Sequence, residues 1–299
     1  MEWRIVLPPS FEKDGFAVLD DVLPAAKADA LRAELLGLRD ADALQPNKVN
    51  FGRSVFIKPH VFDADMHAPE IRALAPTFGA IFRSDALVDA LGASSETLKS
   101  TLLRGSDAKT VKLQYNEGGG GCFPLHFDNP GRPNERAITF LVYLNPAWRE
   151  GDGGELQLLP FLGAPRTIAP LHNRAICFRS DRVLHRTLPS VVERLCFTVW
   201  LDGTSTNSDT DLLLSTKHLN LDRLDCFCGH ALQRTLARTV YADLFAESLT
   251  SCMQESEGCA PMLAAHAAHV ERLMQNPRVK AFVESLRAML PPESSEVRM

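Results

Sequence analysis

The feature that most constrains the fold of this 299-residue chain is a series of short apolar runs between residues 111 and 201, separated by turn clusters. Runs such as Val111–Tyr115, Ala137–Leu144 and Leu195–Leu201 alternate with segments rich in Gly, Pro and Asn, and no helical pattern lies between them. Closely spaced short strands are typical of antiparallel sandwiches and barrels, whereas parallel βαβ units place a helix after each strand. We therefore expect an all-β core in the middle of the chain.

Helical patterns flank this core. Before it, a short apolar run at residues 15–19 precedes one helix with leucines at three- and four-residue spacing, and a second helical pattern covers Pro69 to Leu91. After it, a polar linker leads to an apolar stripe from Leu232 to Leu249 and to further helical segments. We predict three segments: an N-terminal strand and helix flank packed on the core at residues 1–110, the β core at 111–203 and a helical C-terminal extension at 204–299.

Composition excludes several functional classes. The chain has 32 Lys and Arg against 37 Asp and Glu, a net charge of −5, and no basic block, so we expect no nucleic-acid partner. The longest uncharged stretch near the centre, Ala137 to Trp148, is too short to span a bilayer, so we expect no membrane association. Seven cysteines without framework spacing, and no secretory pattern at the N-terminus, predict a cytoplasmic or nuclear location.

A possible metal site lies within the β core. In His126-Phe127-Asp128, alternation along a strand places His126 and Asp128 on the same face, and His185 follows a later strand. Two imidazoles and one carboxylate form the facial triad that binds non-haem Fe(II), whereas a structural zinc site usually has four protein ligands. An H-x-D tripeptide also occurs by chance, and a histidine in a strand is often a satisfied core residue. These residues favour iron and leave the core interpretation open.

Arg194 starts the apolar strand that follows His185. A guanidinium in an apolar barrel needs an anionic partner, because burial of the unpaired charge is costly. Its planar fork fits a carboxylate held by two hydrogen bonds. A diacid that binds iron at one end and Arg194 at the other would meet both demands, whereas on an exposed edge Arg194 would simply be solvated.

The sequence resembles the Fe(II)/2-oxoglutarate-dependent dioxygenases, and within them the prolyl 4-hydroxylase superfamily, most closely the hypoxia-inducible-factor prolyl hydroxylases. The resemblance covers Val111 to Asp202, with a weaker echo that begins at Phe11. The matching motifs are His126-Phe127-Asp128-Asn129-Pro130, Val142-Tyr143-Leu144-Asn145 with Trp148, Gly153-Gly154-Glu155-Leu156, Ser180-Asp181-Arg182 with His185, Arg194, and Thr198-Val199-Trp200.

This resemblance implies a mainly β fold, a double-stranded β-helix or jelly roll, with N-terminal helices and a helical C-terminal extension. It also implies an enzyme that hydroxylates a polypeptide substrate, most simply at a prolyl residue, with Fe(II), 2-oxoglutarate and O₂, and that releases succinate and CO₂. Ascorbate is implied as a reductant. The implied roles are iron ligands for His126, Asp128 and His185, 2-oxoglutarate contacts for Arg194, Tyr143, Thr198 and Tyr115, and substrate contacts for Arg136 and Trp200.

Alternatives remain open at this stage. The segments 116–125 and 129–135 are each one residue longer than in the nearest relatives, and both border the substrate mouth, so the same chemistry on another side chain or on a small molecule is the first alternative. The second is a non-enzymatic binding module with a vestigial metal site. The stripe from Leu232 to Leu249 fits either packing on the barrel or a homodimer formed through the C-terminal helices.

Overall fold

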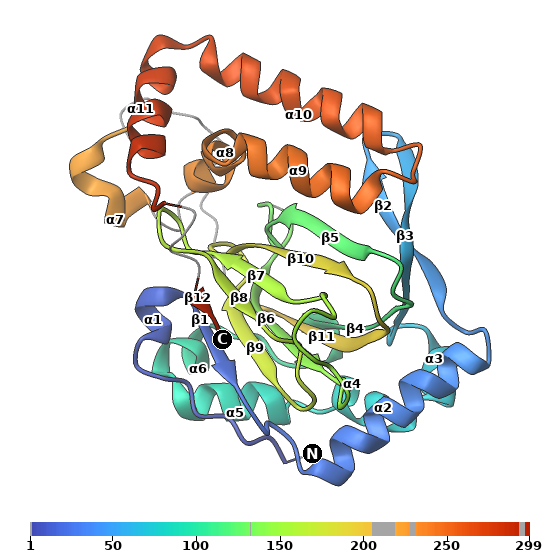
Figure 1. The fold of residues 1–299 in the computed structure, drawn as a ribbon. Coiled ribbons are helices and arrows are strands. Elements are labelled where there is room, and N and C mark those ends of the chain that lie inside the picture. Colours follow the sequence, from blue (N-terminus) through green and yellow to red (C-terminus); the bar gives the residue numbers. More distant parts are fainter. Residues whose placement is uncertain (1, 132, 205–218, 228–230, 293–296) are drawn as a thin grey trace.

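The computed structural model describes residues 2–131, 133–204, 219–227, 231–292 and 297–299. Its centre consists of two sheets (Figure 1). In the described residues the larger sheet has the strand order β1-β9-β6-β11-β4-β3-β2, and the smaller sheet has the order β12-β8-β7-β10-β5. Apolar side chains from both sheets, among them Leu141, Leu158 and Phe178, pack between them. This is the jelly-roll core expected from the sequence.

The strands predicted between residues 111 and 201 are confirmed, and the structure adds one. His185 was expected after a strand, but it lies on one, because β10 pairs with both β5 and β7. The core strands are β4 (Lys109–Asn116), β5 (Gly121–His126), β6 (Arg136–Tyr143), β7 (Leu156–Leu159), β8 (Arg166–Ile168), β9 (Ala175–Arg179), β10 (Leu184–Ser190) and β11 (Arg194–Asp202).

The first third of the chain contributes strands to the larger sheet. The predicted strand β1 (Phe16–Leu19) pairs with β9, and β3 (Ser54–Asp65) pairs with β4. The hairpin of β2 (Gln45–Phe51) and β3 was not predicted, because prolines and lysines interrupt its apolar pattern. The predicted boundaries at residues 110 and 203 stay predictions, but strands from both sides of the first boundary share one sheet.

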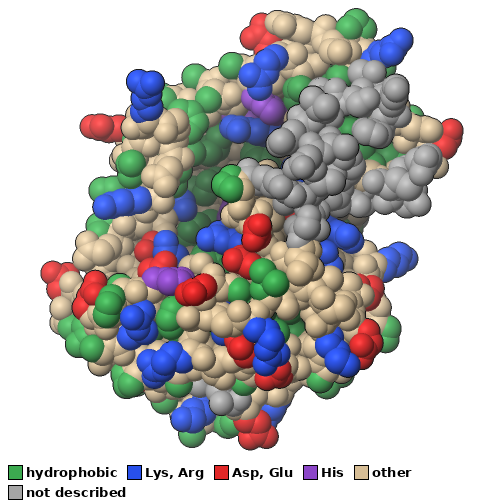
Figure 2. Space-filling model, turned by 180° about the vertical axis from the view of Figure 1, so that it is seen from behind, with side chains coloured by type: hydrophobic (Ala, Val, Ile, Leu, Met, Phe, Trp, Pro, Cys, Tyr) green, Lys and Arg blue, Asp and Glu red, His purple; other side chains and the backbone are tan. Residues whose placement is uncertain are grey.

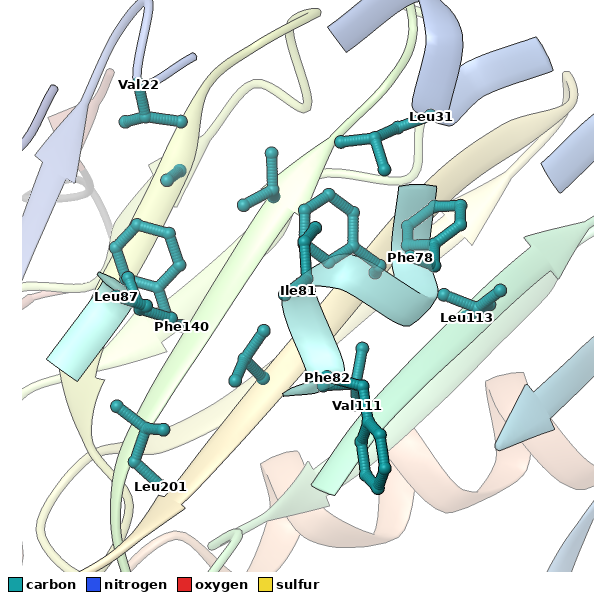
Figure 3. Close-up of a cluster of buried hydrophobic side chains, with 14 of the residues drawn as sticks. Val22, Leu31, Phe78, Ile81, Phe82, Leu87, Val111, Leu113, Phe140 and Leu201 are labelled. Atoms are coloured by element: carbon teal, nitrogen blue, oxygen red, sulfur yellow. The ribbon is translucent and has the colours of Figure 1, made fainter. Parts of the chain in front are cut away.

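Helices from the N-terminal segment cover the outer face of the larger sheet. Phe78 on α4 meets Phe197 on β11 edge to face at 5.2 Å, and Figure 3 shows this cluster of buried side chains. The second predicted helix divides into three pieces. Pro76 separates α3 from α4, and Ser84 and Asp85 separate α4 from α5. The helices here are α1 (Phe11–Asp14), α2 (Ala25–Asp40), α3 (Pro69–Leu74), α4 (Pro76–Arg83), α5 (Ala86–Ser94) and α6 (Glu96–Thr101).

The C-terminal helices pack against the smaller sheet, on the opposite side of the core (Figure 1). Ala237 on α8 and Phe245 on α9 contact Leu125 and Leu184 of the sheet, so the apolar stripe packs on the barrel. Residues 205–211 of the predicted linker lie outside the described residues. The helices are α7 (Leu224–Phe227), α8 (Ala231–Val240), α9 (Ala242–Met253), α10 (Cys259–Met274) and α11 (Pro277–Ala288).

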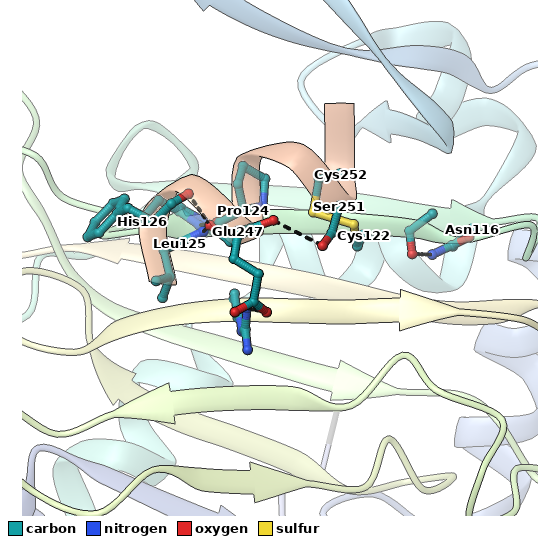
Figure 4. Close-up of a disulfide and its surroundings, with 12 residues drawn as sticks. Asn116, Cys122, Pro124, Leu125, His126, Glu247, Ser251 and Cys252 are labelled. Atoms are coloured by element: carbon teal, nitrogen blue, oxygen red, sulfur yellow. Dashed lines mark hydrogen bonds and ion pairs between the residues drawn. A yellow bond between two sulfur atoms is a disulfide. The ribbon is translucent and has the colours of Figure 1, made fainter. Parts of the chain in front are cut away.

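Two features of the outer layers differ from expectation. A disulfide joins Cys122 on β5 to Cys252 on α9, although the cysteine pattern predicted reduced thiols (Figure 4). The C-terminal segment was predicted to be helical, but its last described element is a strand, β12 (Val297–Arg298), which pairs in parallel with β8. Both features depend on contacts between distant segments, which local patterns do not encode. Across the described residues, no helix is both long and apolar enough to cross a membrane.

Candidate active site

The sheet pairing brings the three predicted metal ligands together. His126 ends β5, and His185 near the start of β10 lies directly opposite it in the ladder. Asp128 follows two residues after His126, and its carboxylate oxygens lie 3.4 Å from His126 Nε2 and 3.7 Å from His185 Nε2. Each of the three offers a ligand atom within 4.8 Å of the others. Within the described parts of the chain this is the one such group of metal-binding side chains found.

Backbone carbonyls set the orientation of both imidazoles. The Nδ1 atom of His126 lies 2.8 Å from the carbonyl oxygen of Pro124, and that of His185 lies 3.1 Å from the carbonyl oxygen of Val183. A proton on Nδ1 donates to each carbonyl and leaves the Nε2 lone pair free for a metal. Burial and the neighbouring His126 lower the pKa of His185 to about 4, so His185 is neutral at pH 7.

The carboxylate of Asp128 is held by a buried hydrogen-bond chain. Thr139 Oγ1 on β6 donates to Asp128 Oδ2 at 2.7 Å and lies 2.9 Å from Ser180 Oγ. Burial alone raises the pKa of Asp128, but the two histidines and Thr139 outweigh it and hold that pKa well below its usual range. Asp128 is therefore an ionised ligand, as a divalent cation requires.

A cavity of about 260 Å³ opens beside this triad and extends to Arg194 on β11. His126 is the ligand nearest to solvent, since 38% of its side chain is exposed against 7% for His185. Leu141, Leu156 and Phe178 give the cavity apolar surface, and Thr198 also lines it. The site is therefore a pocket of mixed polar and apolar lining, with a metal triad near its opening and a cation deeper inside.

Arg194 is buried and has no carboxylate partner among the described residues. Its Nε donates to the carbonyl oxygen of Gly154 at 2.7 Å, and one terminal nitrogen contacts Cys196 Sγ at 3.3 Å. The guanidinium stacks over the ring of Tyr143, 4.9 Å from its centroid. The Tyr143 hydroxyl is buried without a hydrogen-bond partner, and burial raises its pKa to about 12, so it remains a donor. An anion bound here would satisfy both groups.

The comparisons with known proteins agree with this geometry. The 2OG-Fe(II) oxygenase superfamily profile matches residues 112–202. A solved prolyl 4-hydroxylase from Phytophthora capsici is 38% identical, with 94% of this chain and 90% of that chain covered and a TM-score of 0.80. No curated protein matches the chain.

The chain belongs to the prolyl 4-hydroxylase family. It is thus an Fe(II)- and 2-oxoglutarate-dependent oxygenase that uses O₂. Two more distant structures share the fold. They are a Trichoplax adhaerens prolyl hydroxylase in complex with a peptide of hypoxia-inducible factor (22% identity, 64% and 86% of the chains, TM-score 0.55) and a Pseudomonas putida prolyl-4-hydroxylase (22%, 64% and 95%, 0.54).

The residues present fit the cofactors of this family. Two imidazoles and one carboxylate match the donor set of a non-haem Fe(II) centre. The unpaired Arg194 and the unpartnered Tyr143 hydroxyl fit the distal carboxylate of 2-oxoglutarate. Thr198 lies on the cavity wall, where it can contact the same cosubstrate.

The predicted role of Tyr115 is wrong. Tyr115 on β4 points to the helix-covered face of the sheet, where its hydroxyl donates to Glu193 at 2.6 Å and its ring stacks with Arg39. Gln114, its neighbour on β4, lines the cavity instead. Successive residues of a strand face opposite sides, so a shift of one position exchanges the cavity residue for a core residue.

The two predicted substrate contacts lie together at the cavity. Arg136 and Trp200 both line it, and the Arg136 guanidinium lies 4.1 Å above the indole ring. Figure 2 shows a face that is hollowed between the β core and the C-terminal helices, with Lys and Arg side chains around the hollow.

The β2–β3 hairpin also contributes to the cavity. It supplies Asn47, Lys48 and Lys58, none of which was predicted as a site residue. Polar residues spaced along an unpredicted hairpin carry no local signal of this role, because only the pairing of β3 with β4 places them here.

Proposed function

We propose that this protein hydroxylates a prolyl residue of a polypeptide substrate. The observation that carries the proposal is a single cavity with the His126, Asp128 and His185 triad near its opening and the unpaired Arg194 deeper inside. The 38% identity to a Phytophthora capsici prolyl 4-hydroxylase over most of the chain supports the prolyl target, and the peptide complex of the Trichoplax adhaerens enzyme supports a polypeptide.

The protein's role in the reaction is to position the iron ligands and the cosubstrate. When bound, Fe(II), 2-oxoglutarate and O₂ supply the oxidising power for C–H hydroxylation, with succinate and CO₂ as the other products. Thr139 and the carbonyls of Pro124 and Val183 fix the three ligands, and Arg194 with Tyr143 would hold the cosubstrate's distal carboxylate.

At the mouth, Arg136 and Trp200 would contact the substrate backbone and the prolyl ring. Among the described residues the buried Trp200 Nε1 atom has no hydrogen-bond partner, so it is a free donor beside the cavity. The stacked guanidinium of Arg136 limits the rotation of the indole and keeps that donor in place. Replacement of Trp200 by Phe removes this donor together with part of the indole ring.

The experiment incubates the protein with Fe(II), 2-oxoglutarate, O₂ and an array of proline-containing peptides, and reads peptide mass and succinate. We expect an increase of about 16 Da on proline, the mass of one oxygen atom, and equal succinate release. Asp128→Ala removes the only acidic ligand and should abolish both signals. The control Asp107→Ala changes a carboxylate outside the cavity and should keep them.

The other outcomes of this experiment separate the alternatives. Hydroxylation of a residue other than proline, or of a small molecule only, would overturn the prolyl target and keep the chemistry. Succinate release that persists in Asp128→Ala would contradict the metal assignment. If wild-type protein neither binds Fe(II) nor releases succinate, the non-enzymatic binding module becomes the better interpretation.

Three further expectations belong to this proposal. Ascorbate is proposed as the reductant that keeps the iron in its ferrous state, and its omission should shorten the time course. A homodimer through the C-terminal helices remains a proposal, although the stripe from Leu232 to Leu249 packs on the chain's own barrel. Light scattering tests it.

The cytoplasmic or nuclear location also remains a proposal. The Cys122–Cys252 disulfide is more typical of an oxidising compartment, so alkylation of thiols in fresh cell extract is the measurement to make.

A further inference from the structure

The wall of the cavity built from β2, β3 and β4 is basic. Lys48, Lys58 and Lys112 line it, and Arg136 faces them from β6. Among the described residues that line the cavity the one carboxylate is Asp128, which would bind the iron. The part of the cavity that receives the substrate therefore has an excess of positive charge.

These lysines are not equivalent. Lys112 is paired, because its ammonium lies 3.2 Å from Asp63. Lys58 donates to the side-chain oxygen of Asn47 at 2.9 Å and lies over the ring of Phe123, 4.1 Å from its centroid. Among the described residues, no carboxylate forms an ion pair with Lys58. Its two contacts orient the ammonium, and Asp63 and Asp128 offset its charge only from a distance.

The surroundings make this charge unfavourable in the free protein. Lys58 is half-buried, and burial together with the nearby Lys112 lowers its pKa to about 7. The cofactors do not correct the imbalance, because the charges of Fe(II) and Arg194 are matched by those of Asp128 and the 2-oxoglutarate dianion. An additional anion beside Lys58 would balance this excess of positive charge.

The hairpin that carries Lys58 is held in place. Phe51 and Phe56 at its tip pack against Cys252, Met253 and Met262 of the C-terminal helices. The side-chain amide of Asn47 also donates to Asp63, which links β2 to β3 beside Lys58. The ammonium is therefore positioned before a substrate arrives, and preorganisation favours specific recognition.

We propose that Lys58 selects polypeptides that carry a carboxylate close to the target residue. This inference rests on the proposed function, because it assumes that the cavity admits a polypeptide. The shared cavity limits the spacing, so the acidic side chain belongs to a residue next to the target proline or very near it. One half-buried ion pair should change affinity about tenfold, the equivalent of about 1.4 kcal/mol.

The test uses fluorescein-labelled peptides of one sequence in which Glu, Gln or Lys stands beside a single proline. Binding is measured by anisotropy under nitrogen with Fe(II) and 2-oxoglutarate present, and hydroxylation is then measured in air. We expect the Glu peptide to bind about tenfold more tightly than the Gln peptide. Lys58→Glu should reverse the order and favour the Lys peptide. Lys27→Glu, a charge reversal on an exposed residue of α2, is the matched control and should keep the wild-type order.

Several results would overturn the inference. These are equal binding of the three peptides by wild-type protein, or a Glu preference that Lys58→Glu leaves intact. If Lys58→Glu does not fold, the wild-type preference is measured against NaCl, because a charge-based preference shrinks as salt rises and one based on shape does not. A Glu preference without any hydroxylation would refute the prolyl target and keep the inference about Lys58.

Discussion

Replacement of Gly154 by alanine tests whether the backbone before β7 positions the cation of the cosubstrate pocket. Gly154 has a φ of +76°, and a Cβ there would lie 2.8 Å from both Arg194 Cδ and Ser190 Oγ. Its carbonyl accepts the hydrogen bond from Arg194 Nε. Alanine would therefore strain the backbone and displace the Arg194 guanidinium from its position in the pocket.

The expected effect has two parts. A left-handed conformation costs a non-glycine residue about 1–2 kcal/mol, and loss of a hydrogen bond from a charged group costs about 1.5–3 kcal/mol. We therefore expect Gly154→Ala to lower the free energy of unfolding by about 3–5 kcal/mol and to raise the KM for 2-oxoglutarate by at least about tenfold.

Gly151→Ala is the matched control. Gly151 has a φ of +95°, and its Cβ would have no neighbour within 4 Å. It shares the backbone strain without the clash, so it should lower stability by about 1–2 kcal/mol and leave the KM for 2-oxoglutarate unchanged. Chemical denaturation and succinate release at varied 2-oxoglutarate measure both quantities. Equal KM values for the two variants would refute the argument that the close packing of Gly154 positions Arg194.

Three other perturbations have definite expected outcomes. Tyr143→Phe removes a buried hydroxyl that has no hydrogen-bond partner among the described residues, so the cofactor-free protein should gain up to about 1 kcal/mol in stability. Its affinity for 2-oxoglutarate should fall, and calorimetry measures both quantities. The pKa of His185 is about 4 in the folded protein against an ordinary 6.5, so the free energy of unfolding of the metal-free protein should fall by up to about 3 kcal/mol as the pH falls from 6.5 to 4. His185→Gln should reduce this dependence of stability on pH. Cys252→Ser removes a crosslink between residues 130 apart in sequence, so under non-reducing conditions it should lower the free energy of unfolding by about 2–5 kcal/mol. Dithiothreitol should destabilise the wild-type protein by the same amount and leave the stability of Cys252→Ser unchanged.

Much of the fold follows from local patterns. The runs at 137–144 and 195–201 became β6 and β11, and leucines at helical spacing became the buried face of α2. These patterns work because burial of one face imposes the period of the element on its sequence. The β2–β3 hairpin escaped prediction, because it is partly exposed and its strands pair with partners and helices far away in the chain.

The site divides in the same way. The spacing of His126 and Asp128 predicted that both side chains face one pocket, and the period of a strand is sufficient for that inference. For Tyr115 the family resemblance misled, because it implied a cavity contact for a residue of β4 that lies opposite Leu195 of β11 and faces the helix-covered side. A strand's register is a property of the sheet, so one residue could not be distinguished from its neighbour in advance.

The sequence by itself determined the class of chemistry, since two histidines, an aspartate and an arginine in β segments specify a metal ligand set and an anion site. Only the tertiary structure decided that His185 lies opposite His126, that Arg194 has no carboxylate partner in the described residues, and that Lys58 reaches the cavity from a hairpin. The reason is physical. Residue type sets which bonds an atom can make, whereas the position of that atom depends on pairing and packing between segments that are far apart in the chain.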